Sequence, residues 1–102
     1  MTIQEYVDDV LCVPVTRIGN RLIVESIELV LDTKDHKFYQ RLSEVTGKTT
    51  RYLEKAIRDS KILGLQYMSP ENRQKIFRGD ESTATNEYIV RAAEYYRRME
   101  DK

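Results

Sequence analysis

A short segment of the chain carries hydrogen-bonding side chains at the spacing of one helical face. Arg51, Lys55 and Arg58 recur every three or four residues, so a helix would place them side by side. Guanidinium and ammonium groups bind phosphates and guanine edges, and the Glu54 carboxylate can accept a hydrogen bond from cytosine. These residue types favour binding to the major groove of double-stranded DNA. The predicted DNA-binding residues are Lys48, Thr49, Thr50, Arg51, Tyr52, Glu54, Lys55 and Arg58.

The residues that would position this face have the spacing of a helix-turn-helix. Leu42 and Val45 form an apolar stripe on a first helix, predicted over Lys37–Thr46. Ser43 is small enough for close contact between two helices. Gly47 then supplies the turn, because glycine adopts a positive φ without steric conflict.

A second helix is predicted over about 50–61, capped by the hydroxyl of Thr49 or Thr50. Leu53, Ala56 and Ile57 would face inward, and further apolar residues allow the helix to continue past Ser60. Lys48 departs from the pattern, because helix-turn-helix motifs usually carry an apolar residue there. An alternative interpretation remains open: two amphipathic helices joined by a glycine also occur as packing units whose charged face is only solvated.

Composition indicates one folded domain over residues 1–102. The chain is 33% charged and 40% hydrophobic, which is typical of a globular domain. No apolar run approaches the roughly 18 residues needed to span a bilayer, and the N-terminus lacks the positive charge of a secretory signal. We therefore expect a cytoplasmic protein without a membrane partner. The lone cysteine, Cys12, excludes an internal disulfide and is predicted to be a small buried hydrophobe.

The formal net charge is zero, but the charges are unevenly distributed. The segment from Lys34 to Lys61 has a surplus of basic residues, and a local basic patch affects phosphate binding more than the total charge does. The bases are Lys34, Lys37, Arg41, Lys48, Arg51, Lys55, Arg58 and Lys61, against the acids Asp35, Glu44, Glu54 and Asp59.

The rest of the chain is also predicted to be helical. A first helix begins near Ile3 and ends at about Leu11 or Cys12, ahead of Pro14. The segment Arg21–Asp32 is rich in β-branched residues and alternates in part like a strand. We nevertheless expect a central core helix there, with Asn20 as its N-cap, because a single strand would have no partner.

Two more helices are expected in the second half. Ser69 and Pro70 mark the start of a short helix that ends at about Phe77, followed by a polar surface loop over Arg78–Ala84. The last helix spans Asn86–Met99, capped by Thr85 or Asn86. The predicted fold is therefore all-α, a compact bundle of five or six helices that contains a helix-turn-helix.

The last helix has a wide apolar face, because Tyr88, Tyr95 and Met99 lie beside the residues needed to dock it. The favoured interpretation of this wide face is that the tyrosines bury their rings against the domain and keep their hydroxyls in water. The alternative is a protein contact, either self-association on tandem DNA sites or a contact with RNA polymerase.

No catalytic or metal-binding constellation emerges. His36 is the only histidine, and no serine or cysteine can be placed beside it. The chain lacks a glycine-rich phosphate loop and an acidic metal cluster. We expect neither an enzyme nor a cofactor.

From Val13-Pro14 onward the chain resembles a known family, the C-terminal DNA-binding effector domain of the sporulation response regulator stage zero sporulation protein A. The resemblance does not include that family's N-terminal receiver domain, which these 102 residues do not contain. The matching points are Val13-Pro14, Tyr39, Leu42-Ser43, Thr49-Thr50, Glu54-Lys55-Ala56-Ile57-Arg58 and Asn86-Glu87-Tyr88-Ile89.

The resemblance implies an all-helical domain that binds short promoter elements and can occupy them in tandem. Glu54, Lys55 and Arg58 fall on the family's base-contacting and phosphate-contacting positions. Tyr52 stands where the family has a DNA-reading arginine, and Arg51 beside it is a partial substitute. A second hypothesis therefore stays open: a protein-interaction module of the same fold that has lost DNA binding and modulates a related regulator.

Overall fold

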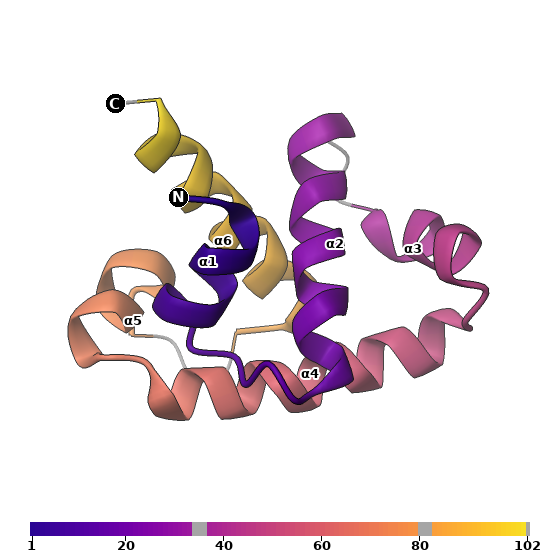
Figure 1. Cartoon of the computed structure of the whole chain (residues 1–102), viewed down its shortest axis with the longest axis horizontal. Helices are drawn as coiled ribbons and strands as arrows, with labels where there is room; N and C mark the ends of the chain where they lie inside the picture. Colours follow the sequence, from indigo (N-terminus) through magenta and orange to yellow (C-terminus); the bar gives the residue numbers. More distant parts are fainter. Residues whose placement is uncertain (34–36, 80–82, 102) are drawn as a thin grey trace.

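Helices account for all the regular structure in residues 1–33, 37–79 and 83–101, the parts of the chain that the computed structural model describes. The all-α prediction is confirmed, and the segment around Val24 is a helix rather than a strand. The elements are α1 (Ile3–Glu5), η1 (Tyr6–Val10), α2 (Ile18–Thr33), α3 (Phe38–Thr46), α4 (Thr50–Tyr67), α5 (Pro70–Phe77) and α6 (Thr85–Glu100) (Figure 1).

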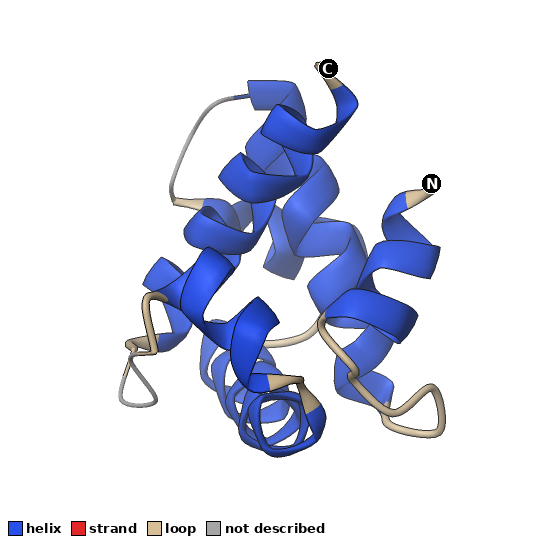
Figure 2. Ribbon diagram, turned by 90° about the vertical axis from the view of Figure 1, so that its left-hand side faces the viewer, coloured by secondary structure: helices blue, strands red, loops and turns tan. Residues whose placement is uncertain are grey.

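The longest helix, α4, forms one side of the molecule. Figure 1 shows it along the lower edge, and Figure 2 shows it nearly along its axis with the other helices above it. Helix α2 stands on α4 and also packs against α3, α6 and the N-terminal turns. One side of α4 is therefore not covered by another helix.

Several helix ends are set by local capping residues. The Thr49 hydroxyl accepts a hydrogen bond from the Tyr52 N–H at 3.1 Å, so Thr49 is the N-cap of α4. Ser69 caps α5 in the same way, with Pro70 in the first turn. Gly47 ends α3 with a φ of 73°. These three predicted boundaries are confirmed, because each depends on side chains next to it in sequence.

The N-terminal helix ends in a wide turn. Residues Tyr6–Val10 form a π-helix, closed by a 3.0 Å hydrogen bond from the Leu11 N–H to the Tyr6 carbonyl. The extra residue per turn places Tyr6, Val7 and Leu11 in the interior together. Cys12 follows with a φ of 56° and is only partly buried, so its prediction as a buried residue is correct in part.

The prediction for the start of α2 is wrong. The helix begins at Ile18, and Asn20 lies inside it, buried, instead of capping it. The Asn20 amide donates hydrogen bonds to the Val13 carbonyl at 3.0 Å and to Asp8 at 2.9 Å. Its oxygen accepts one from Gln4 at 2.9 Å. Tertiary contacts therefore decided the role of Asn20, which fastens the N-terminal segment to α2.

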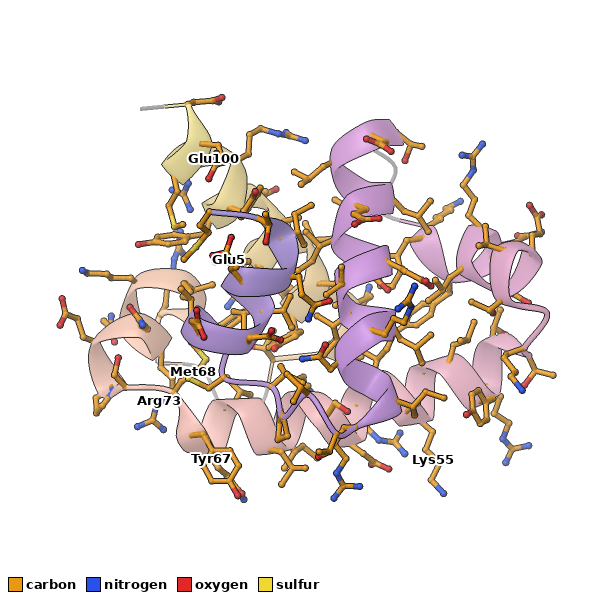
Figure 3. The ribbon with its side chains drawn as sticks, in the orientation of Figure 1. Glu5, Lys55, Tyr67, Met68, Arg73 and Glu100 are labelled. Atoms are coloured by element: carbon orange, nitrogen blue, oxygen red, sulfur yellow. The ribbon has the colours of Figure 1, made fainter. Side chains whose placement is uncertain are left out.

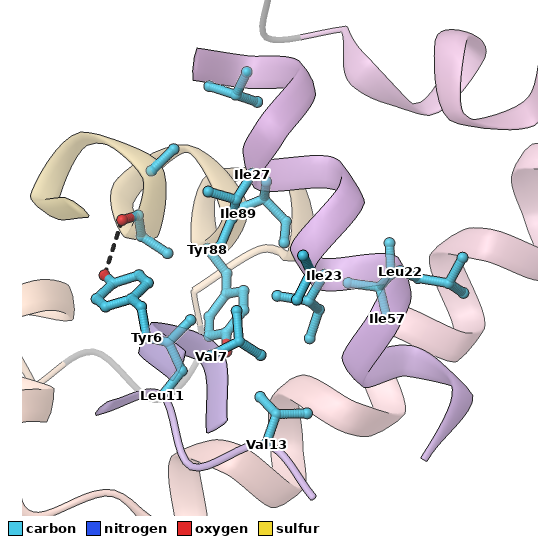
Figure 4. Packing of buried hydrophobic residues seen from close by; sticks show 14 of the residues in the cluster. Tyr6, Val7, Leu11, Val13, Leu22, Ile23, Ile27, Ile57, Tyr88 and Ile89 are labelled. Carbon is cyan, nitrogen blue, oxygen red and sulfur yellow. Dashed lines mark hydrogen bonds between the residues drawn. The ribbon is translucent and has the colours of Figure 1, made fainter. Parts of the chain in front are cut away.

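The centre of the core lies between α2, α6 and the N-terminal turns (Figure 4), and buried residues of α3, α4 and α5 extend it. Ile23 and Ile27 of α2 are fully buried, and each such side chain contributes roughly 1.5–3 kcal/mol. The Tyr6 hydroxyl donates to the Ala92 carbonyl at 2.8 Å. The ring of Tyr88 is also fully buried, and it stacks on Phe77 with ring centroids 4.8 Å apart.

Two glycines allow close packing against α4. A Cβ atom on Gly19 would lie 2.0 Å from the Ser60 hydroxyl oxygen and 2.6 Å from the Ala56 carbonyl oxygen. A Cβ atom on Gly64 would lie 2.7 Å from the Leu11 carbonyl oxygen. The first contact seats the start of α2 directly on α4, which matters for the surface described below.

The last helix has its predicted bounds to within one residue at each end, but its predicted cap is wrong. It spans Thr85–Glu100, and Ala84 occupies the N-cap position without a side-chain hydrogen bond. Capping by Thr85 or Asn86 is therefore wrong. Tyr88 is a core residue, so it neither keeps its hydroxyl in water nor is available to a protein partner. Tyr95 and Met99 are only partly buried.

The two chain ends meet at one side of the molecule, near Glu5 and Glu100 in Figure 3. The Tyr96 hydroxyl donates to the Met1 carbonyl at 2.8 Å. Among the described residues, no helix has the length and apolar character needed to cross a bilayer. The loop predicted after α5 includes residues 80–82, and His36 lies in 34–36; both stretches are outside the described residues, while Thr83 is buried.

Candidate nucleic-acid interface

The connection between α3 and α4 is three residues long and held by local hydrogen bonds. The Ser43 hydroxyl donates to the Lys48 carbonyl at 2.6 Å, and the Lys48 N–H donates to the Thr46 hydroxyl at 3.2 Å. Gly47 has the left-handed conformation and Thr49 caps the next helix. The two helices and their turn are present as predicted, while their assignment as a DNA-binding helix-turn-helix stays a prediction.

The apolar residues of the two helices divide between core and surface. Leu42, Leu53 and Ile57 are fully buried, and Ala56 is partly buried against them. Val45 is 71% exposed, so its prediction as part of the inward stripe is wrong. Val45 lies near the C-terminal end of α3 with its side chain toward solvent.

Three cations form a continuous exposed row on α4, which we call the basic ridge: Arg51, Lys55 and Arg58. The positions are separated by four and three residues, so they lie on one side of the helix. Figure 3 shows Lys55 pointing away from the rest of the molecule. Arg51 and Lys55 have no hydrogen bond or ion pair with any described residue. Their charged groups are therefore accessible to an external anion.

Residues at the start of α4 lie beside the basic ridge. Thr50 is exposed in the first turn, and the Tyr52 ring is 42% exposed. The Lys48 ammonium nitrogen lies 5.5 Å from the centroid of that ring, a cation–π distance. Thr49 is exposed too, but its hydroxyl already accepts the Tyr52 N–H. Lys48 and Tyr52 thus contact each other at one edge of the basic ridge.

Glu54 has partners inside the protein. Its carboxylate forms an ion pair with Arg58 at 3.1 Å and accepts a hydrogen bond from the Thr85 hydroxyl at 3.4 Å. Thr85 is the first residue of α6, whose N-cap residue Ala84 offers no side-chain oxygen. A carboxylate there complements the positive end of the helix dipole. Glu54 therefore links α4 to α6 on one flank and holds one guanidinium of the basic ridge.

Tyr39 lies next to Glu54. Its hydroxyl is buried with no hydrogen-bond partner among the described residues. Burial, and to a smaller extent the nearby Glu54 carboxylate, raise the Tyr39 pKa well above its usual value, so the group is a neutral phenol at physiological pH. It supplies packing on this flank.

The structure adds one cation that sequence reasoning missed. Arg17, in the turn before α2, lines a hollow of about 280 Å³ together with Tyr52, Lys55 and Asp59. It is exposed. No local pattern could have identified it, because its place beside α4 depends on how α2 packs.

The structure also removes one predicted member of the basic patch. Lys61 is only 7% exposed, and its ammonium group donates to the Thr83 carbonyl at 2.7 Å. Helix α4 continues to Tyr67, beyond the predicted 50–61, and Lys61 is the last basic residue on it. The accessible positive charge is thus concentrated on the first three turns.

Other chemistry has little support in the described residues. Burial, and to a smaller extent the nearby Asp9 carboxylate, raise the pKa of Cys12, which favours the unreactive thiol. Within the described ranges, no group of three or more histidine, cysteine and carboxylate side chains could hold a metal ion. Comparison with known proteins found no matching family model, no matching curated protein and no matching solved structure.

Proposed function

We propose that this protein is a sequence-specific DNA-binding transcription regulator, with the first half of α4 as the recognition helix. The observation that supports this most is the division of α4 into two faces. Leu53 and Ile57 are buried, while the basic ridge is exposed and has few internal partners. A helix is about 10–12 Å across, which suits the roughly 12 Å width of the major groove.

The groups on this face have complementary chemistry. Arg51 and Lys55 can donate to guanine edges or phosphates, and Lys48 in the preceding turn can donate to the DNA backbone. Thr50 can donate to a phosphate from the first turn. If Lys48 and the three cations of the basic ridge each displace one counterion, the slope of log affinity against log salt concentration is about −3.6. Because the protein has no net charge, we expect a modest affinity for DNA. Because the contacts are to phosphates, we expect that affinity to fall as the salt concentration rises.

Selection from random DNA duplexes with the intact chain tests this function, followed by anisotropy titrations of the selected duplex. Lys55→Ala should weaken binding by about 1–3 kcal/mol if Lys55 reads a base. Lys75→Ala is the matched control, because Lys75 is an exposed helical lysine on α5 that pairs with Glu71. Absence of binding to any duplex at low salt contradicts the proposal.

One observation favours the alternative, a protein-interaction module that has lost DNA binding. Ile62 is 47% exposed and follows Arg58 on the same side of α4. An apolar side chain there suits a protein partner better than a phosphate backbone. A stable partner complex that survives replacement of Arg51, Lys55 and Arg58 by alanine, with no DNA binding, would select this alternative.

The partner and location predictions belong with the main proposal. Self-association on tandem sites, or a polymerase contact, would use the part of α6 that carries the partly buried Tyr95 and Met99. A regulator of this kind acts on promoter DNA in the cytoplasm and needs no cofactor. Cross-linking on duplexes with one or two copies of the selected site tests self-association.

A further inference from the structure

Arg17 lies at the edge of the basic ridge although it belongs to a different part of the chain. It occupies the turn before α2, where its carbonyl accepts a hydrogen bond from the Asn20 N–H at 3.0 Å. Its exposed side chain lines the same hollow as Tyr52 and Lys55. The guanidinium has no hydrogen bond or ion pair with any described residue.

The backbone that carries Arg17 has a defined place. Gly19, two residues later, packs directly on Ser60 and Ala56 of α4. Asn20 then fastens the preceding segment through its bond to the Val13 carbonyl. The backbone is therefore fixed on both sides of Arg17, at Val13 before it and at Gly19 after it.

We infer that Arg17 binds one phosphate of the DNA backbone, at the edge of the groove that α4 enters and beside Lys55. This inference rests on the proposed DNA-binding function. A helix in the major groove has phosphates on both of its flanks, and a cation on a flank meets the backbone rather than the base edges. Arginine suits that position, because its planar fork can donate two hydrogen bonds to one phosphate.

The hollow also contains an opposing charge. Asp59 lines it and has no ion pair with any described residue. A carboxylate beside a bound phosphate lowers affinity, so Asp59 and Arg17 should act in opposite directions. The comparison with a cation outside the hollow then separates a phosphate site from a general effect of positive charge.

Anisotropy titrations at several salt concentrations test the inference, using the selected duplex and an unrelated one. Arg17→Ala should weaken binding to both about threefold to tenfold and reduce the salt slope by about 1. Asp59→Asn should strengthen binding to both. Arg21→Ala is the matched control, because Arg21 is also exposed near the start of α2 but pairs with Glu25 and lines a different hollow.

The outcomes separate the inference from the function on which it rests. If the wild type binds DNA and Arg17→Ala behaves like Arg21→Ala, the inference is overturned and the function stands. If Arg17→Ala alters the preferred sequence, Arg17 reads a base and the phosphate site is wrong. If the wild type binds no duplex, both are overturned. Arg17→Lys, which keeps the charge, should retain the salt slope.

Discussion

Lys55 and Lys61 lie on the same helix, yet their surroundings are opposite. Lys55 is exposed and has no partner among the described residues, whereas Lys61 is buried and donates to the Thr83 carbonyl at 2.7 Å. The first half of α4 presents charge to solvent, whereas in the second half the one basic residue is turned into the packed structure. A basic residue in a helical pattern therefore does not reveal whether its charge serves binding or stability.

The largest expected effect concerns the contact that places α2 on α4. Gly19→Ala should lower the free energy of unfolding by about 3 kcal/mol. The added Cβ would clash with the backbone carbonyl oxygen of Ala56, which cannot rotate away as a side chain could. Urea denaturation measures this. Gln66→Ala, at an exposed position of α4, is the control and should change stability by less than about 0.5 kcal/mol. Equal stability of the two variants would contradict the close packing.

The two lysines themselves can be exchanged for alanine. Lys61→Ala should cost about 2 kcal/mol of stability, because it leaves the buried Thr83 carbonyl without this donor. Lys55→Ala should change stability by less than about 0.5 kcal/mol and weaken DNA binding instead. Thermal melts and anisotropy titrations on both variants check the two expectations. A loss of DNA binding by folded Lys61→Ala protein would break the comparison.

A smaller effect is expected at the turn that starts the recognition helix. Thr49→Ala should lower stability by about 1 kcal/mol, because the Tyr52 N–H loses its cap. Thr50→Ala is the matched control, since Thr50 has no hydrogen bond in the described structure through its hydroxyl. The difference between the two melting curves measures the cap.

A stability effect smaller than that of Thr49→Ala is expected at Glu54. Glu54→Gln should change the free energy of unfolding by about 0.5 kcal/mol, because the ion pair with Arg58 is half exposed. Its effect on DNA binding is more informative. If Glu54 mainly holds Arg58 and α6, removal of its charge strengthens binding at low salt. If binding weakens and the preferred sequence changes, Glu54 reads a base.

Predictions that depend on neighbouring residues succeeded. Gly47 ends α3, and Thr49 and Ser69 cap the helices that follow them, as predicted. A cap or a left-handed turn needs only the adjacent backbone. Predictions for Asn20 and Thr85 were wrong for the opposite reason. Each has a polar side chain suited to a cap, but each bonds to a distant residue instead.

The sequence was sufficient to establish the helical class, most helix boundaries and the spacing of Arg51, Lys55 and Arg58. These depend on a period of 3.6 residues and on local hydrogen bonds. Only the tertiary structure showed that Lys61 is buried, that Glu54 reaches α6 and that Arg17 joins the edge of the basic ridge. Those facts depend on which helices pack together, and at Gly19 that packing follows from a contact between residues far apart in the chain.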